Sequence, residues 1–390
     1  MNSYEPDGLN DMTEKSEKSE KKIAYGIGGE GTGNGVKRDS LQALRGLAFA
    51  GIFLGHFYYF GWTPVSVSVF FILSGFLLTV KKNSSYESYS LADSFKEALR
   101  RISKLYPLHI IMMLVSIPFV IYRAGGVHLS DLMIKIGCNV LLIQSLVPSA
   151  DINASLNGVS WFLSTLFVLY ILFPFLYRMF KKIRGKHALL LVIVAGIALQ
   201  TLYVYVVGLT VKSADVMTYL IHSSPLYRIF DMSYGILLGL IVQGEGYEDS
   251  GKRSVTISVT EAIILAATAL LVYIWSKDSM IVYLSYAPVC PLISVIWVRL
   301  FAGKAGVITR LLTNRVTVFL GDRSGSAFLI HFPIVVYINT FIFPYLTVLK
   351  RTIIHGILFP GSVILTLVLS YLYDRWSASR RSTSIGKVID

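Results

Sequence analysis

The sequence predicts an all-α integral membrane protein, with about ten transmembrane helices around an internal polar cavity and one short interfacial or half-inserted helix. Of its 390 residues, 54% are hydrophobic and only 15% are charged, whereas globular chains carry about 25% charged residues. The mean hydropathy is +0.61. Apolar stretches of spanning length recur from Leu41 onward. Together these observations exclude a water-soluble enzyme.

Residues 1–37 differ from the rest of the chain, because they combine an alternating Glu/Lys stretch with a Gly-rich piece. Such a composition predicts a disordered cytoplasmic tail. No apolar core follows a basic start here, so no cleavable signal peptide is expected. We expect a membrane domain over residues 38–373 and a short cytoplasmic C-terminal tail over residues 374–390.

Each predicted span is an apolar stretch of roughly the length that crosses a bilayer, about 20 residues at 1.5 Å each. The ten stretches are 41–60, 65–80, 105–122, 160–180, 188–208, 225–243, 259–276, 281–301, 326–346 and 354–373. A further stretch, 132–148, contains polar residues and stops at Pro148.

Basic residues decide the predicted orientation. The net charge is +13, and lysine and arginine concentrate in alternate loops, which are expected to be cytoplasmic. These loops are 81–104, 178–187, 244–258 and 302–325. If 132–148 spanned, the basic run 181–186 would lie outside, so we interpret 132–148 as half-inserted on the outer side. Both termini of a multi-pass plasma membrane protein would then be cytoplasmic.

The basic excess is interpreted as an orientation signal and as lipid contact. Membrane lipids are therefore expected partners, and nucleic acid is not. Cys138 and Cys290 both lie in apolar runs, so we expect neither a disulfide framework nor a metal site. The oligomeric state is not indicated.

Arg45 and His56 are the most informative ionisable pair in the first span. Eleven residues at 100° each make three turns plus about 20°, so both side chains project from one helix face, ~16 Å apart along the axis. Alone, Arg45 is equally typical of a snorkelling anchor and His56 of a packing residue. The shared face favours a polar cavity, because ionisable groups inside membranes usually line one.

A basic helix entry follows at Arg100, Arg101 and Lys104. Three cations at a cytoplasmic helix end suit a phosphate group, and the positive-inside rule explains them equally well. Ser74 belongs to a Ser-Gly step that permits close helix packing.

The remaining histidines, Trp161 and Arg228 carry weaker signals. His331 either lines the same cavity as His56 or packs, and His109 faces either packing or a ligand. Taken alone, Trp161 and Arg228 are interpreted as interfacial anchors. Four further histidines at loops or span ends are expected to be solvated: His128, His187, His222 and His355.

Six motifs in order resemble acyltransferase family 3, a family of integral-membrane enzymes. The first three are Arg45 with His56 eleven residues on, the Phe-Phe-x-Leu-Ser-Gly-Phe-Leu run at 70–77, and the basic helix closing in Tyr106-Pro107. The Trp161 segment, Arg228 with Gly235 and Gly239, and Gly321 through Leu329-Ile330-His331-Phe332-Pro333 continue the resemblance over about residues 38–373. Leu166 stands where the family often has Glu, so no role of that Glu carries over.

The resemblance implies an O-acyltransferase that moves an acetyl or short acyl group from acetyl-CoA to a glycan or other hydroxyl. It implies His56 as general base or acyl carrier, with Arg45 beside the donor. It also implies a phosphate clamp of Arg100, Arg101 and Lys104, and acceptor contacts from Ser74, Trp161, Arg228 and His331.

A multi-span transporter or flippase for a lipid-linked sugar is the alternative. The sequence shows no inverted repeat and no paired interrupted helices, which many transporters have. Consumption of the thioester distinguishes the two functions.

Overall fold

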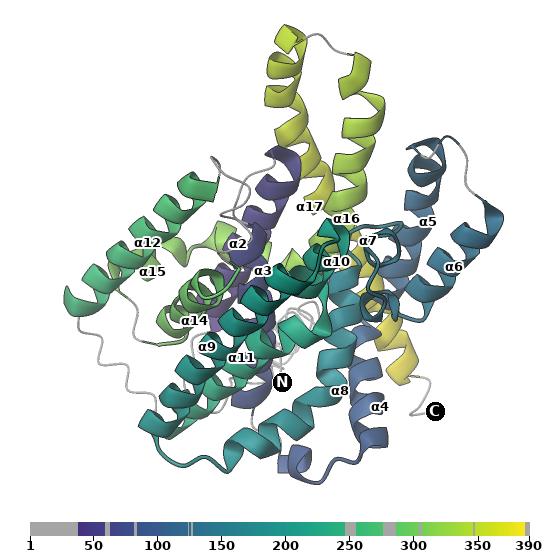
Figure 1. The fold of residues 1–390 in the computed structure, drawn as a ribbon. Helices are drawn as coiled ribbons and strands as arrows, with labels where there is room; N and C mark the ends of the chain where they lie inside the picture. The colour runs from purple at the N-terminus through teal and green to yellow at the C-terminus, as the bar shows by residue number, and fades with distance from the viewer. Residues whose placement is uncertain are drawn as a thin grey trace, which may run out of the picture.

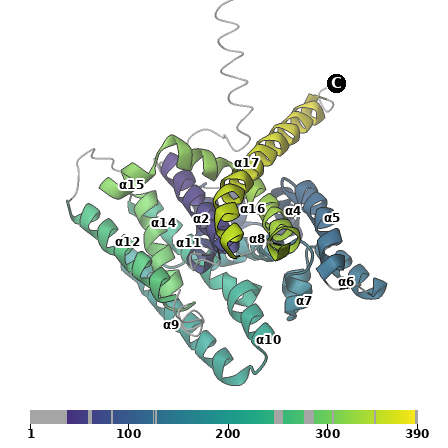
Figure 2. The same ribbon diagram turned by 90° about the horizontal axis from the view of Figure 1, so that it is seen from above.

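The computed structural model describes residues 38–58, 63–81, 84–123, 125, 128–245, 255–275, 286–303, 306–345 and 348–386. Over these ranges the secondary structure is helical, and no strand occurs in them. The predicted tail at 1–37 lies outside the described residues. Residues 374–386 of the predicted C-terminal tail continue the last helix, which projects from the rest of the fold in Figure 2.

The helices follow one another in chain order (Figure 1). They are α2 (Arg38–Tyr58), α3 (Thr63–Val80), α4 (Leu91–Ile102), α5 (Tyr106–Arg123), α6 (Leu129–Val140), α7 (Ala150–Asn153), α8 (Trp161–Lys181), α9 (Lys186–Thr210), α10 (Ala214–Thr218), α11 (Pro225–Glu245), α12 (Val255–Trp275), α14 (Val289–Ala302), α15 (Val307–Leu312), α16 (Arg315–Phe341) and α17 (Val348–Gly386). Short helical turns join some of them: η1 (Ser84–Glu87), η2 (Gln144–Leu146), the π-helical η3 (Tyr219–Ser223) and η4 (Phe343–Tyr345). Both views place α5 and α6 at one side and α12 and α15 at the other, with α2, α11 and α16 between them (Figures 1 and 2).

Among the described residues, seven helices are long and apolar enough to cross a membrane. They are Thr63–Val80, Tyr106–Arg123, Trp161–Lys181, Lys186–Thr210, Ala214–Glu245, Arg315–Phe341 and Gly356–Arg380. Two shorter apolar helices, Val255–Leu271 and Val289–Ala302, match predicted spans only in part. The first predicted span is α2, whose charged residues lower its hydropathy. Ten spans are therefore not confirmed, and the internal polar cavity stays a prediction.

The segment 302–325, predicted to be a cytoplasmic loop, is largely helical, because α15 and the start of α16 occupy it. Asn314 begins α16 with a capping box, in which its side-chain oxygen accepts from the N–H groups of Val316 and Thr317 at 3.0 and 3.1 Å. Glu261 of α12 accepts from the backbone N–H groups of Gly306 and Ile308, both at 2.8 Å, and so caps α15. These caps satisfy backbone donors that helix starts leave open.

The stretch predicted to be half-inserted, 132–148, contains the end of α6 and the η2 turn. α6 has 12 residues, which reach roughly 18 Å, whereas the hydrocarbon core is about 30 Å thick. His109 of α5 contacts the carbonyl oxygen of Asn139 through Nε2 at 2.9 Å. α6 is therefore too short to cross alone, and it is tied to α5.

Two glycines bring α2 and α16 into backbone contact. A Cβ atom on Gly321 would lie 1.8 Å from the carbonyl oxygen of Gln42, and one on Gly46 would lie 2.1 Å from that of Thr317. Ten residues beyond these glycines, His56 and His331 also meet. The two helices thus run parallel in one fixed register.

α3 and α11 form a second parallel pair. A Cβ atom on Gly235 would lie 2.0 Å from the carbonyl oxygen of Ile72, and one on Gly75 would lie 2.3 Å from that of Met232. Arg228 bonds Ser68 earlier along the same two helices. The predicted topology makes these the second and sixth spans, which must run in the same direction. An additional crossing at α6 would make them antiparallel.

Candidate active site

His56 of α2 and His331 of α16 form the centre of the candidate site. Nδ1 of His56 lies 2.8 Å from Nε2 of His331, and the two rings are nearly parallel, with centroids 5.1 Å apart. His331 is fully buried, and His56 is half-buried. Phe49 and Phe53 pack against the His331 ring at 5.7 and 5.5 Å. The two imidazoles therefore lie among apolar side chains, and His331 is the more deeply buried of the two.

The partners of His331 assign the protons of the histidine pair. Nδ1 of His331 lies 3.2 Å from the carbonyl oxygen of Ala327, which can only accept, so this Nδ1 carries a proton. In a neutral ring Nε2 of His331 is then the acceptor, and Nδ1 of His56 donates to it. Nε2 of His56 consequently bears a lone pair, as a general base requires.

Arg45 lies on α2, about three helical turns before His56, as the spacing predicts. Its Nη1 donates to Oε1 of Gln42 at 3.2 Å, and Nε2 of Gln42 donates to Oδ1 of Asp322 at 2.8 Å. Arg45 also interacts electrostatically with Asp322 and Tyr170. The guanidinium of Arg45 therefore lies close to α16 and α8. This position does not fit the alternative in which Arg45 is a snorkelling anchor at the membrane surface.

Arg101 of α4 approaches the same tyrosine. Its Cζ atom lies 5.7 Å from the ring centroid of Tyr170, and Nη2 donates to the hydroxyl of Tyr86 at 2.8 Å. Nη2 also pairs with Oε1 of Glu97 at 2.6 Å. Tyr170 therefore connects Arg45, on the histidine helix, with the predicted phosphate clamp on α4.

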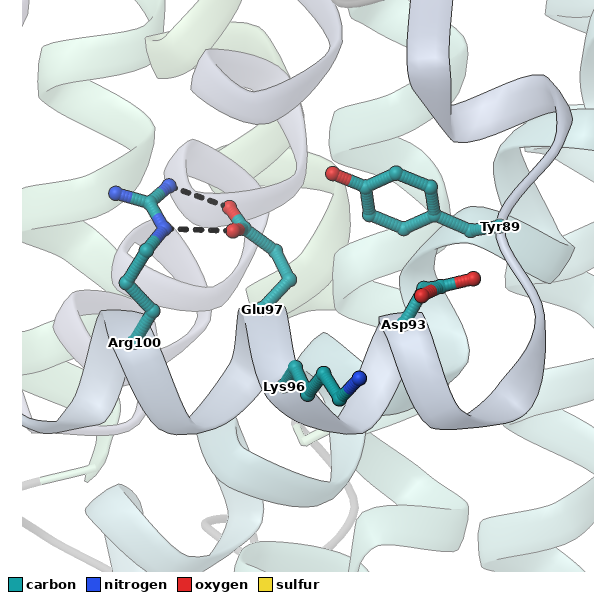
Figure 3. Close-up of a pocket in the computed structure, with 5 residues that line it drawn as sticks. All are labelled: Tyr89, Asp93, Lys96, Glu97 and Arg100. Carbon is teal, nitrogen blue, oxygen red and sulfur yellow. Dashed lines mark hydrogen bonds and ion pairs between the residues drawn. The ribbon is translucent and has the colours of Figure 1, made fainter.

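The side chain of Arg100, the neighbouring residue on α4, is more exposed to solvent than that of Arg101. It pairs with both oxygens of Glu97 at 2.7 Å (Figure 3). Partial burial acts to raise the pKa of Glu97, but the hydrogen bond from Arg100 and the charges of both arginines lower that pKa below its usual value. Two cations thus share one ionised carboxylate, which leaves a net positive charge for a phosphate.

A surface pocket with a volume of about 220 Å³ lies along α4 (Figure 3). Its lining combines two carboxylates with two cations and one phenol: Tyr89, Asp93, Lys96, Glu97 and Arg100. Lys104 lies beyond the end of α4, in the turn before α5, and its carbonyl oxygen accepts from Tyr373 at 3.0 Å. Of the three predicted clamp residues, Arg100 and Arg101 therefore lie on α4 and pair with Glu97, whereas Lys104 lies outside that helix.

The structure brings Trp161 and Arg228 together, because both contact Phe71 and His222. Trp161 begins α8 and is 7% exposed, and its ring stacks on Phe71 at 6.4 Å. Arg228 is fully buried, and Nη1 donates to Oδ2 of Asp231 at 2.6 Å and to the hydroxyl of Ser68 at 3.0 Å. Neither residue is an exposed interfacial anchor, and the donors of Arg228 are largely used within the protein.

Ser74 is half-buried and donates to the carbonyl oxygen of Phe70 at 2.8 Å, one turn back in α3. Its neighbour Gly75 makes the close contact with α11. The predicted acceptor contact of Ser74 stays a prediction.

Two residues near the site were missed by the sequence interpretation. Asp231, the counter-ion of Arg228, could have been found from its i,i+3 spacing. His222 was predicted to be solvated, and this is wrong. It is half-buried, its ring packs on Trp161 at 4.8 Å, and it interacts electrostatically with His56.

The family model of the acyltransferase domain matches residues 38–375. The chain belongs to this acyltransferase family, acyltransferase family 3. A curated relative, "Acyltransferase MdmB" of Streptomyces mycarofaciens, is 29% identical over 283 residues, which cover 70% of this chain and 68% of the relative. No solved structure matches the chain.

Membership of acyltransferase family 3 and the seven apolar helices together make the protein a membrane acyltransferase. The matched region runs from α2 into α17 and contains His56, His331, Arg45 and the whole of α4. The polar groups that can perform acyl transfer lie on α2 and α16, and the cations that can hold an anionic donor lie on α4 and at Arg45.

Proposed function

We propose that the protein moves an acetyl or short acyl group from acetyl-CoA to a hydroxyl of a cell-surface or lipid-linked glycan. The observation that carries this proposal is the hydrogen bond between His56 and His331, because it leaves a lone pair on Nε2 of His56. Acyl transfer to a hydroxyl needs such a base. In this proposal the enzyme lies in the plasma membrane with both termini in the cytoplasm.

The reaction follows from the proton positions. Nε2 of His56 takes the proton of the acceptor hydroxyl, and the oxygen attacks the thioester carbonyl carbon. The carbon–sulfur bond then breaks, and the proton passes from His56 to the departing thiolate. His331 orients the His56 ring and stabilises its transient positive charge through the hydrogen bond. No charge is left on the enzyme after one turnover.

The donor site is supported by the path from α4 to His56. Arg45 and His56 are eleven residues apart on one helix, ~16 Å along its axis, which suits an elongated donor lying beside α2. Arg101 and Arg45 flank Tyr170 at the cytoplasmic end of this path. We propose that they contact the phosphates and the pantetheine arm of the donor, with Arg100 and Lys104 adding positive charge.

The test combines thioester consumption with analysis of the acceptor. Purified protein in lipid nanodiscs receives acetyl-CoA and glycans extracted from cells that lack the gene. Released thiol is followed with time, and the glycans are analysed by mass spectrometry. Wild-type protein should release thiol and add one acyl group to a glycan.

Two variants complete this test. His56→Gln should lower the rate by ~10²–10⁴, whereas His187→Gln, at an exposed histidine of α9, should behave as wild type. Thiol release without any acylated glycan would overturn the acceptor class. An active His56→Gln protein would overturn the role of His56.

A further inference from the structure

His222 lies in the π-helical turn η3, between α10 and α11. Its ring is fixed on two sides, because it packs on Trp161 at 4.8 Å and on Tyr286 at 5.5 Å. It is half-buried, as is His56, and the two histidines interact electrostatically. π-helical turns inside helical segments frequently occur at functional sites. Trp161 in turn contacts Phe162, which packs on Phe328 beside His331. A continuous row of aromatic rings thus joins His222 to the histidine pair on α2 and α16.

Arg228 determines which nitrogen of His222 carries the proton. Nη2 of Arg228 lies 3.4 Å from Nδ1 of His222, and Nε of Arg228 donates to the carbonyl oxygen of the same residue. A guanidinium can only donate, so Nδ1 of His222 accepts. The proton of the neutral ring is therefore on Nε2, on the side away from Arg228.

The two histidines consequently offer opposite groups. His56 presents a lone pair on Nε2, and His222 presents an N–H on Nε2. Arg228 is itself fixed by Asp231 and Ser68 at 2.6 and 3.0 Å, with both side chains of the ion pair fully buried. The donor group of His222 is thus held in place before any substrate arrives, as stabilisation of a developing charge requires.

We propose that Nε2–H of His222 donates a hydrogen bond to the carbonyl oxygen of the acyl group and stabilises the oxyanion of the tetrahedral intermediate. This inference rests on the proposed acyl transfer from a thioester. Attack by the acceptor oxygen moves the carbonyl electron pair onto that oxygen, next to Nε2–H of His222. When the carbon–sulfur bond breaks, the pair returns to the carbonyl, and His222 keeps its proton throughout.

In this proposal Arg228 does not contact the acceptor. It is a positioning residue, because its guanidinium is committed to Asp231, Ser68 and His222 within the protein. Its buried charge keeps Nδ1 of His222 unprotonated and so maintains the N–H on Nε2.

The test uses three substitutions of His222 in the full-length protein. His222→Phe keeps an aromatic ring against Trp161 and removes the donor. His222→Gln places an amide N–H near the position of Nε2. His222→Asn retains a polar group beside Arg228 but is too short to reach the position of Nε2. His128→Phe, at an exposed histidine, is the matched control.

In the acetyl-CoA assay, kcat of His222→Phe should fall by roughly 10²–10³, with little change in the KM for acetyl-CoA. His222→Gln should retain more activity than His222→Asn, by about tenfold. Because His56 remains the base, the acidic limb of the pH–rate profile should persist in His222→Phe. His128→Phe should have wild-type activity.

The outcomes separate this inference from the proposed function. Full activity of His222→Phe overturns the inference and leaves acyl transfer intact, whereas an active His56→Gln protein overturns the role of His56 in the proposed function. If His222→Phe does not fold, the comparison of Gln with Asn decides. Equal activity of those two variants shows that His222 serves packing only.

Discussion

The two parallel helix pairs, α2 with α16 and α3 with α11, share one kind of backbone contact and hold different polar side chains. In both pairs a glycine on each helix faces a carbonyl oxygen of the other. Beyond the contact, α2 and α16 hold two imidazoles that form one hydrogen bond. Along α3 and α11 lies a buried ion pair between Arg228 and Asp231.

This difference predicts that one helix pair determines the reaction rate and that the other determines the stability of the fold. A neutral imidazole pair loses no counter-charge when one ring is replaced, so its replacement should affect rate more than stability. A buried ion pair leaves an uncompensated charge when one partner is removed, which costs several kcal/mol. We therefore expect the first pair to control turnover and the second to control folding and the position of His222.

The largest expected effect on stability is that of Asp231→Asn. It leaves Arg228 buried without its counter-charge, which should lower the free energy of unfolding by ~3–5 kcal/mol. Unfolding of the purified protein by a denaturing detergent measures the loss. His331→Gln is the contrasting variant and should lose ~1 kcal/mol or less in the same titration. Equal losses would remove the distinction between the two helix pairs.

Gly321→Ala should come next, because the new methyl group would meet the carbonyl oxygen of Gln42 at 1.8 Å. Backbone cannot yield as a flexible side chain does, so we expect a loss near the upper end of the roughly 1–3 kcal/mol typical of overpacking. Separation of α2 from α16 should also lower activity. The control is Gly325→Ala, one turn further along α16, where the methyl group meets Leu105 at an ordinary 3.4 Å. A tolerated Gly321→Ala would contradict the close contact.

The smallest expected effect concerns the donor. The side chain of Arg101 is 20% exposed and lies beside Tyr170. Arg101→Gln removes its positive charge, so the KM for acetyl-CoA should rise about ten- to hundredfold. Arg100 is 64% exposed, so Arg100→Gln should raise this KM less. Initial rates at varied acetyl-CoA measure both. A larger effect of Arg100→Gln would move the donor site to the pocket along α4.

Much of the fold could be predicted from the sequence, because the lengths of the apolar stretches and the positions of lysine and arginine indicate the membrane helices and their connections. The start of α16 could not, since Asp322 and Arg323 are typical of a loop. In the structure Asp322 accepts from Gln42, and the Arg323 guanidinium stacks on Phe319 with its Cζ atom 3.8 Å from the ring centroid. These tertiary contacts compensate for charges that lower the hydropathy of the segment.

The candidate site was predictable in part. The spacing of eleven residues placed Arg45 and His56 on one face, and the resemblance added His331. The sequence alone does not show that His56 and His331, which are 275 residues apart, contact each other. The close packing of α2 against α16 at Gly46 and Gly321 brings them together. His222 was missed because a histidine shortly before Pro225 is typical of an exposed turn, and only the π-helical backbone and Arg228 direct it inward.

A double-mutant cycle on His56 and His331 tests the central claim most directly. The rate of acyl transfer from acetyl-CoA is measured for His56→Gln, for His331→Gln and for the protein with both substitutions. If the two rings act as one unit with His56 as the base, His331→Gln alone should lower the rate at least about tenfold. The double variant should then be no slower than His56→Gln, because residues that act together are not additive. Full activity of His331→Gln, or two losses that multiply in the double variant, would contradict the account.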